Sequence, residues 1–298
     1  MAEIKSRLTP ARVRLLLGLL LAVVLAVEIF TSAPAAAPFL PAPHAVVADV
    51  VRATKPQSGS FAELIRTDAV AALELAEREH ARNVRDYTCT FVKQELLPSG
   101  MSAEQKIATA YRQEPLSVFM HWVKNPGKAE RVIYVKGRWN DVTAENPDER
   151  ELAICQPGVI ARVFVKSVKR PIHSPLAREM SRRYIDEFGF GHSLYLILKY
   201  CHLARERGEL ALTFRGESDF DGRPTWVLER RLPYTGPNGT YPDRVAEIHI
   251  DQEWHVPVCV HCFADDARTK LLGRYEYTDV NLGAGLSDSV FEPSTYGM

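Results

Sequence analysis

The residues of this chain that most closely resemble a reactive site lie in the segment HVPVCVHCF, residues 255–263, where two cysteines stand in C-x-x-C spacing around a histidine. Such a pair works in redox chemistry or zinc binding when both sulfurs lie on the same side of a turn. The alternating valines instead predict a β-strand, in which Cys259 and His261 share one face and Cys262 lies on the other. His255 and Cys259 would then be about 13 Å apart. We expect no metal or redox site here, because Cys259 and His261 would need a further ligand from a neighbouring strand.

A second candidate is the segment GHSLY, residues 191–195, which imitates the G-x-S-x-G turn around a hydrolase nucleophile. Tyr195 replaces the final glycine that this tight turn needs, and no buried strand precedes it. His192 or Ser193 capping the following helix is the simpler interpretation. An enzyme would need other polar residues, such as His121, His261 and Cys259, to converge in a cleft.

Composition excludes binding by bulk charge. The chain has 298 residues, with 37 basic and 37 acidic residues, so no net field attracts nucleic acid. Phosphate-binding glycine loops are absent from the sequence. The five cysteines are too few for a dense disulfide scaffold and are expected to be core thiols. We assign no catalytic residue, metal or cofactor.

The N-terminus predicts export. Basic residues precede the apolar run LLLGLLLAVVLAV, residues 15–27, which Glu28 interrupts before Ile29 and Phe30. Residues 1–31 are therefore a signal peptide or a signal anchor, with the anchor favoured and residues 15–30 as its membrane segment. Residues 32–60 are rich in alanine and proline and predict a linker, and residues 61–298 predict a single domain. The domain would lie in the periplasm or on the outer face of the inner membrane.

Within that domain, apolar periodicity predicts a long amphipathic helix over residues 61–83 and helices over 174–188 and 193–207. Period-two segments predict strands over 86–96, 116–124, 130–137, 152–155, 159–168, 210–220, 225–232, 245–251, 256–263 and 271–282. Both faces of the strand at 116–124 are apolar, so each should be covered. Helices and strands do not alternate strictly along the chain, which indicates an α+β fold. We expect a curved antiparallel sheet, or half-barrel, with helices against its concave side.

The remaining feature that could indicate a function is the large number of apolar side chains on the predicted strands. A strongly curved sheet can gather such side chains around a cavity, and the alternative is a filled core between sheet and helices. The candidate ligand-binding residues are Phe91, Met120, Trp122, Ile133, Trp226, Leu228, Ile248, Ile250, Val258, Tyr275 and Tyr277.

The segments TYPDRVAEIHIDQEWHVPV and LLGRYEYTDVNLGAGLSDSVFEP carry a family resemblance. They resemble the closing strands of an uncharacterised family of exported bacterial proteins, a domain of unknown function, and more distantly the outer-membrane lipoprotein carrier superfamily. The resemblance covers about Asp86 to Pro293. Its motif is carried by Tyr275, Tyr277, Asp279, Asn281, Gly285, Leu286, Asp288 and Phe291, with one residue too many before Gly285. It implies a half-barrel whose interior shelters acyl chains in the carrier superfamily.

These observations favour a non-enzymatic envelope protein that binds a lipid-like or otherwise apolar ligand. A lipid or lipid-modified partner, and the membrane through the N-terminal segment, are the expected partners. The alternative is a structural or protein-interaction domain with a filled core, and a hydrolase-type enzyme ranks third.

Overall fold

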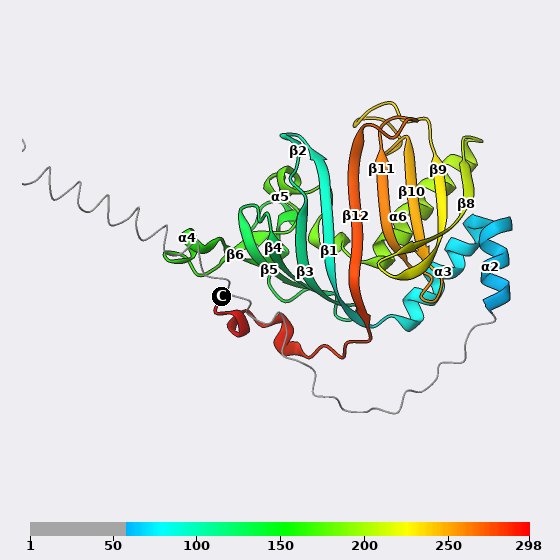
Figure 1. Ribbon diagram of the computed structural model, residues 1–298. Helices are drawn as coiled ribbons and strands as arrows, with labels where there is room; N and C mark the ends of the chain where they lie inside the picture. The colour runs from blue at the N-terminus through cyan, green and yellow to red at the C-terminus, as the bar shows by residue number, and fades with distance from the viewer. Residues whose placement is uncertain (1–57) are drawn as a thin grey trace, which may run out of the picture. The chain divides into compact units, whose positions relative to one another are not determined.

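A computed structural model describes residues 58–298, with side chains from Phe61 onward. Its centre is one twelve-stranded antiparallel sheet in the order β7-β6-β5-β4-β3-β1-β12-β11-β10-β9-β8, with the short β2 pairing with β1 (Figure 1). The sheet is curved and open. Because an antiparallel sheet is combined with helices that do not alternate with its strands, the protein belongs to the α+β class, as predicted. The strands are β1 (Asp86–Leu97), β2 (Gly100–Met101), β3 (Gln105–Arg112), β4 (Ser117–Lys124), β5 (Ala129–Val135), β6 (Leu152–Pro157), β7 (Val168–Pro171), β8 (Ala211–Phe220), β9 (Arg223–Arg231), β10 (Val245–Asp251), β11 (Pro257–Phe263) and β12 (Leu271–Leu282).

Two meanders build this sheet and meet at its centre. Strands β1 to β7 run outward to one edge; the chain then crosses to the other edge and returns through β8 to β12. The first and last strands pair in the middle, where Phe91 lies opposite Tyr277 and their rings are 5.0 Å apart. The hairpin between β8 and β9 turns at Asp221 and Gly222, whose positive φ angles of 53° and 72° suit a tight primed turn.

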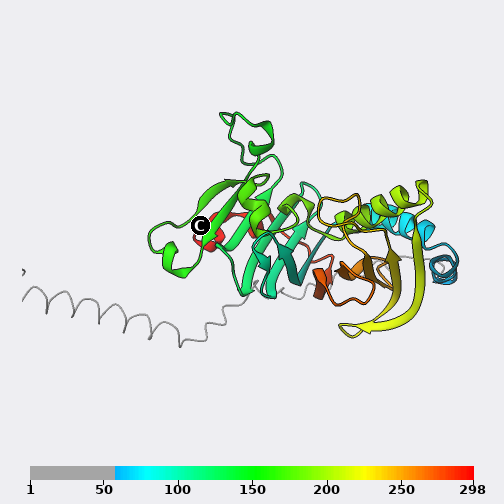
Figure 2. The ribbon, with the colours of Figure 1, turned by 90° about the horizontal axis from the view of Figure 1, so that it is seen from above.

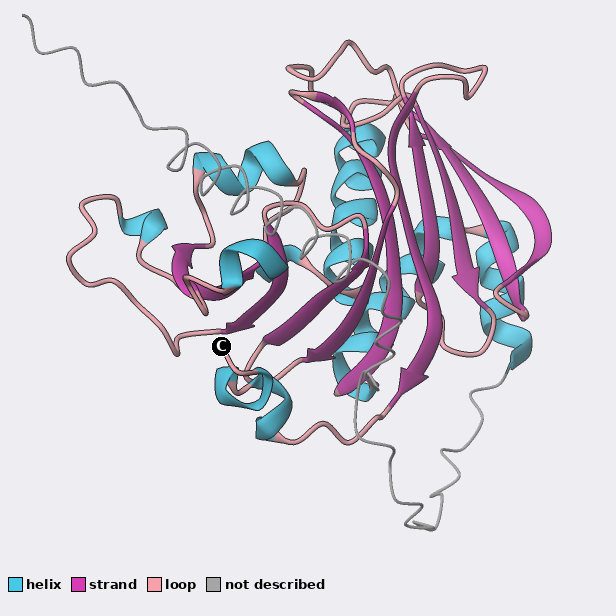
Figure 3. Ribbon diagram, turned by 60° about the vertical axis from the view of Figure 1, so that its left-hand side comes forward, coloured by secondary structure: helices cyan, strands magenta, loops and turns pink. Residues whose placement is uncertain are grey.

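The α-helices are α2 (Ser58–Thr67), α3 (Ala69–Asn83), α4 (Val159–Arg162), α5 (Pro175–Met180) and α6 (Phe190–Glu206), and the short 3-10 helices are η1 (Pro147–Glu149), η2 (Ile185–Glu187), η3 (Asp288–Phe291) and η4 (Pro293–Tyr296). Helices α3 and α6 lie against the concave face of the sheet (Figure 2). The segment with α5 and α6 forms the crossover between the two meanders (Figure 3). Helices α3 and α6 pack together over one half of the sheet, and a core of buried apolar residues fills the space between them and β9 and β10.

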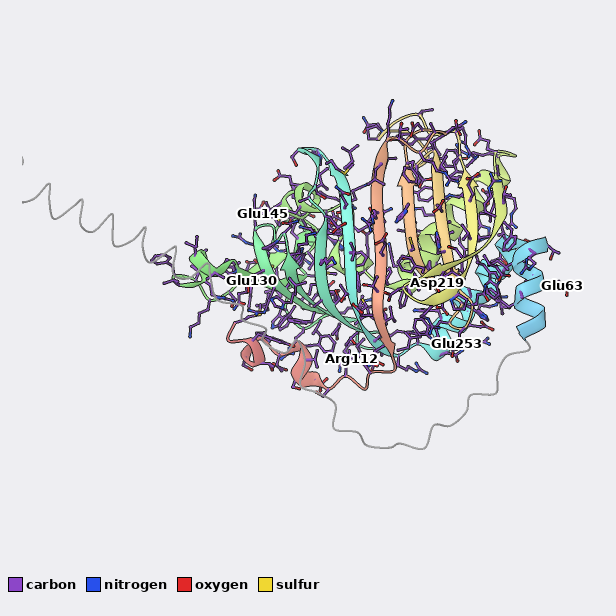
Figure 4. The ribbon with its side chains drawn as sticks, in the orientation of Figure 1. Glu63, Arg112, Glu130, Glu145, Asp219 and Glu253 are labelled. Atoms are coloured by element: carbon purple, nitrogen blue, oxygen red, sulfur yellow. The ribbon has the colours of Figure 1, made fainter. Side chains whose placement is uncertain are left out.

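Both faces of β4 are covered, as its sequence predicts. Val118 and Met120 point into the concave core, while Phe119 stacks on Tyr296 of η4 with ring centroids 4.3 Å apart. Arg112 holds the same C-terminal segment by donating to Asp288 at 2.6 Å (Figure 4). The C-terminal segment therefore packs on the convex face of β4 and β5.

Several predicted elements differ from the structure. The predicted helix over 61–83 is two helices, because Asp68 accepts a hydrogen bond from the Ala71 amide and starts α3 as its N-cap. The predicted strand over 159–168 is wrong, since α4 and a loop occupy most of it. The predicted helix over 174–188 ends at Met180, and β3 was missed altogether because Ala108 and Ala110 on its second face give a weak alternation.

The predicted signal or anchor at residues 1–31 and nearly all of the predicted linker lie outside the described residues. Within residues 58–298, no helix is both long and apolar enough to cross a membrane.

Candidate functional site: a cavity beneath the curved sheet

A cavity of about 780 Å³ lies against the concave face of the sheet. Its sheet wall comes from β1, β3 to β7, β9, β11 and β12, and its opposite wall comes from the crossover segment that contains α5, η2 and the first turns of α6. The walls are mainly apolar. The volume falls within the range of small-molecule sites in proteins, about 300–1,000 Å³. Five of the eleven sequence candidates line it: Phe91, Met120, Trp122, Tyr275 and Tyr277.

The other six candidates are buried elsewhere. Four of them pack under the long helices α3 and α6, in a core of buried apolar side chains; these are Trp226, Leu228, Ile248 and Ile250. Val258 belongs to the core around Tyr277. Ile133 is next to the cavity-lining Val132 and opposite Phe119 in the β4–β5 register, so it faces the convex side. The cavity therefore lies where the cover is the short helix α5, and apolar side chains fill the space where α3 and α6 pack together.

Sequence reasoning missed much of the lining. Ile107 lies on the unpredicted β3, and the cover contributes Ile172, Leu176, Met180 and Phe188. Leu176, Met180 and Phe188 lie within the predicted helix over 174–188, but no sequence signal shows that they face a cavity instead of a filled core.

The segment after α5 is fixed to the sheet by a charged cluster in the cavity wall. Lys93 Nζ lies 2.9 Å from Glu95 Oε2 and donates to Ser181 Oγ at 3.0 Å. Tyr275 donates its hydroxyl to Glu95 Oε1 at 3.0 Å, and the Arg182 amide donates to the same oxygen at 3.3 Å. Burial alone raises the pKa of Glu95, but Lys93, Tyr275 and Ser181 outweigh burial, so the pKa lies below its usual value and the carboxylate is charged.

At its other side the cover touches the turn between β4 and β5. A Cβ placed on Gly127 would lie 3.3 Å from Met180 Cε, so the end of α5 lies directly against this turn. His173, before α5, contacts Asp186 of η2 through Nε2 at 3.0 Å. The C-terminal end of α5 is thus held both at the centre of the sheet and at the β4–β5 turn.

Three cavity-lining side chains have a buried nitrogen without a protein hydrogen-bond partner among the described residues: Trp122 Nε1, His192 Nε2 and Arg230 Nε. Arg230 is 3% exposed and is otherwise well bonded, with Asp243 Oδ2 at 3.0 Å and the Ile197 carbonyl at 3.2 Å. Burial lowers the pKa of His192, so its ring is neutral at pH 7. Each of these nitrogens is closed off from solvent, so none of them is exposed to the open volume of the cavity.

The C-x-x-C segment is divided between the two faces of β11, as predicted. Cys262 lines the cavity, while Cys259 and His261 lie on the convex face and contact each other at 3.4 Å. Glu276 of the neighbouring β12 completes a group with the spacing of metal ligands, its oxygen 2.8 Å from His261 Nε2. Arg274, however, donates to both oxygens of Glu276, at 2.6 and 2.7 Å, so a guanidinium already neutralises this carboxylate.

The same group does not form a nucleophile with its base. Burial raises the pKa of the Cys259 thiol, and Cys259 and Glu276 both contact Nε2 of His261, so this one nitrogen cannot accept a proton from sulfur while it donates to the carboxylate. His121 lies on β4, with three strands between it and β11, so the convergence that an enzyme would need at these residues is not met.

Ser193 is also placed differently from the prediction. Helix α6 starts at Phe190 with Gly189 as its N-cap, so neither His192 nor Ser193 caps it. The Ser193 hydroxyl instead lies 3.4 Å from the Tyr277 hydroxyl in the cavity wall.

Comparison with known proteins gives the class of the chain. Residues 84–296 match the family described as protein of unknown function DUF1571, and the chain belongs to this family. The predicted resemblance to an uncharacterised bacterial family is confirmed. No curated protein matches the sequence.

Similar solved structures share little sequence with this chain. A crystal structure of MucB has a TM-score of 0.44 and 15% identity, and the match covers 75% of this chain and 62% of MucB, less than two thirds of its length. Lipoprotein LppX of Mycobacterium tuberculosis has a TM-score of 0.37 and 11% identity, covering 74% of this chain and 97% of LppX. A domain from Vibrio parahaemolyticus named for outer-membrane lipoprotein sorting has a TM-score of 0.33 and 12% identity, covering 76% and 98%. All these TM-scores lie below 0.5, and nothing about a ligand of this chain follows from them.

Proposed function

We propose that this protein is an exported, non-enzymatic binding protein that holds one lipid-like amphiphile in the cavity beneath its sheet. The observation that carries the proposal is the open volume itself. A structural domain with a filled core would close this space, whereas about 780 Å³ between β1–β6 and the crossover segment is enough for a small ligand. The apolar walls suit a hydrocarbon chain.

The basic side chains of the lining refine the ligand class. Lys128, Arg170 and Arg183 line the cavity and are at least partly exposed, and each can only donate hydrogen bonds, so the ligand should carry acceptor oxygens as well as apolar carbon. A fatty acid or an acylated molecule has this combination, and a pure hydrocarbon does not. The exported location rests on the basic and apolar N-terminal sequence.

The direct experiment is native mass spectrometry of the protein purified after export, followed by organic extraction. A near-stoichiometric co-purifying amphiphile supports the proposal and identifies its class. A chain that stays at its unliganded mass after incubation with envelope lipids overturns it and favours the protein-interaction alternative.

A matched pair of variants locates the binding. Cys155 lines the cavity from β6, whereas its neighbour Ile154 is buried on the other face of the same strand. Cys155→Trp fills part of the volume and should abolish ligand retention, while Ile154→Val should retain the ligand at the cost of about 1 kcal/mol of stability. In a series of fatty acids, each added methylene should tighten binding about fourfold until the chain fills the cavity, from about 0.8 kcal/mol per buried CH₂.

A further inference from the structure

The connection between β6 and β7 exposes an unusual run of apolar side chains. We define the β6–β7 segment as residues 158–170, which include α4, the loop after it and the first three residues of β7. Ile160 and Val163 are each 80% exposed and Phe164 is 85% exposed, with Val159 and Val165 exposed beside them. The other exposed large apolar residues of the described chain are far more scattered, such as Val142 and Tyr195. We propose that the β6–β7 segment inserts into the surface of an anionic lipid bilayer.

Contiguous exposed apolar residues usually mark a surface that is covered in function. The segment projects at the end of the sheet, beyond β6 (Figure 1). Arg162, in the middle of this run, holds it to the sheet by donating to Gln156 and to Glu130 at 3.2 Å each (Figure 4). A run that is held in place while its apolar side chains stay uncovered is suited to contact with a large apolar phase.

Charge selects lipid as the occupant. The charged residues of the β6–β7 segment are all basic, and Lys166, Lys169 and Arg170 are exposed directly after the apolar run. Apolar side chains beside lysine and arginine are typical of elements that lie in the membrane interface, where each cation is attracted by anionic head groups. A protein partner would need acidic residues around an apolar groove, so the anionic bilayer is the simpler match to this composition.

The β6–β7 segment lies next to the cavity, so membrane contact would bring the cavity close to the bilayer. Ala161, Val165 and Val168 belong to the segment and also line the cavity. With the apolar tip in the interface, the cavity would open at the membrane surface, and an amphiphile could move between bilayer and cavity with little exposure to water. This part of the inference rests on the proposed function.

Tryptophan quenching tests the contact in the full chain. Phe164→Trp and Val142→Trp place a new indole on two side chains of almost equal exposure, 85% and 83%, in different loops. Each variant is mixed with phosphatidylcholine vesicles, with and without phosphatidylglycerol, that carry bromine on their acyl chains, and the wild-type signal is subtracted. Because both proteins have the same N-terminal segment, any difference between them reports on the loops.

We expect bromine to quench the tryptophan at 164 and not that at 142, and only when phosphatidylglycerol is present. Lys166→Glu together with Lys169→Glu should lower the quenched fraction, with partitioning reduced at least fivefold for each cation removed. Equal quenching at both positions, or none at 164, overturns the inference, and the latter directs the search to a protein partner. A protein that carries an amphiphile by mass spectrometry but shows no quenching at 164 retains the proposed function and loses this inference alone.

Discussion

Lys93 and Glu95 lie two residues apart on β1, so both side chains point to the concave face, and their charged atoms are 2.9 Å apart inside an apolar cavity wall. The pair is almost completely shielded from solvent, with side-chain exposures of 10% and 2%. Through Ser181 it also ties the end of α5 to the sheet. An ion pair in this position fixes the cover of the cavity as well as its wall.

Removing one partner of this pair should be more harmful than removing both. Glu95→Leu leaves the Lys93 charge uncompensated and should lower the free energy of unfolding by about 3–5 kcal/mol. The double variant with Lys93→Met should recover much of this loss, because no unpaired charge remains. Urea unfolding of the wild type, both single variants and the double variant measures the coupling. Costs that simply add would show that the pair does not act as a unit.

The stack between Phe119 and Tyr296 should hold the C-terminal segment on the convex face. Tyr296→Ala removes the ring 4.3 Å from Phe119 and the hydrogen bond from its hydroxyl to the Val290 carbonyl, so we expect a loss of about 2 kcal/mol. Tyr195→Ala, at a half-exposed position on α6, is the control and should change stability by less than about 0.5 kcal/mol. Thermal or urea unfolding distinguishes the two, and equal effects would deny the stack a structural role.

His80 should make the fold sensitive to mild acid. It is buried on α3, where a Cβ placed on Gly191 of α6 would lie 2.8 Å from its ring, and burial lowers its pKa to about 4. The unfolded chain binds a proton near pH 6.5 and the folded chain does not, so the free energy of unfolding should fall as pH drops from about 6.5 to about 4.

His80→Leu removes the titrating group, and the apolar ring site should accept it with little loss because Nε2 has no partner among the described residues. Its stability should therefore show a smaller slope between pH 6.5 and 4 than that of the wild type, measured by urea unfolding across this range. An unchanged slope would assign the acid sensitivity to other groups.

A second acid transition should occur at lower pH. Burial alone raises the pKa of Glu229, but hydrogen bonds from Arg231, Arg215 and Arg268 outweigh it and lower the pKa to about 2. Because its pKa is lower in the folded chain than in the unfolded chain, the Glu229 carboxylate adds to the free energy of unfolding at pH values above about 4.5. This contribution is lost as the pH falls from about 4.5 to about 2. Glu229→Gln should flatten unfolding stability in this range, while Glu63→Gln, exposed on α2 (Figure 4), should retain the wild-type slope.

The sequence predicts the fold class well because most strands show a local alternation of side chains that can be recognised without knowledge of the fold. Alternation at 86–96 and 271–282 identifies the two strands that meet at the sheet centre, and the valines of β11 place Cys259 and Cys262 on opposite faces. The cavity was less predictable. Met120 and Ile248 lie on strands with the same apolar pattern, but different helices cover them. The short α5 covers Met120, which lines the cavity, whereas the long α3 and α6 cover Ile248, which is buried in a filled core. This difference depends on tertiary packing, which the periodicity of a single strand does not predict.

The pairing of β1 with β12 has a consequence for how the chain reaches its native state. Phe91 must find Tyr277 across almost the whole domain, so the central contacts of the sheet have large sequence separation, which slows folding. While the chain is synthesised from its N-terminus, one edge of β1 stays unpaired until residues 271–282 have been made and can form β12. During that interval the unpaired edge of β1 is open to strands of other chains, and rapid delivery of β12 protects the protein from aggregation.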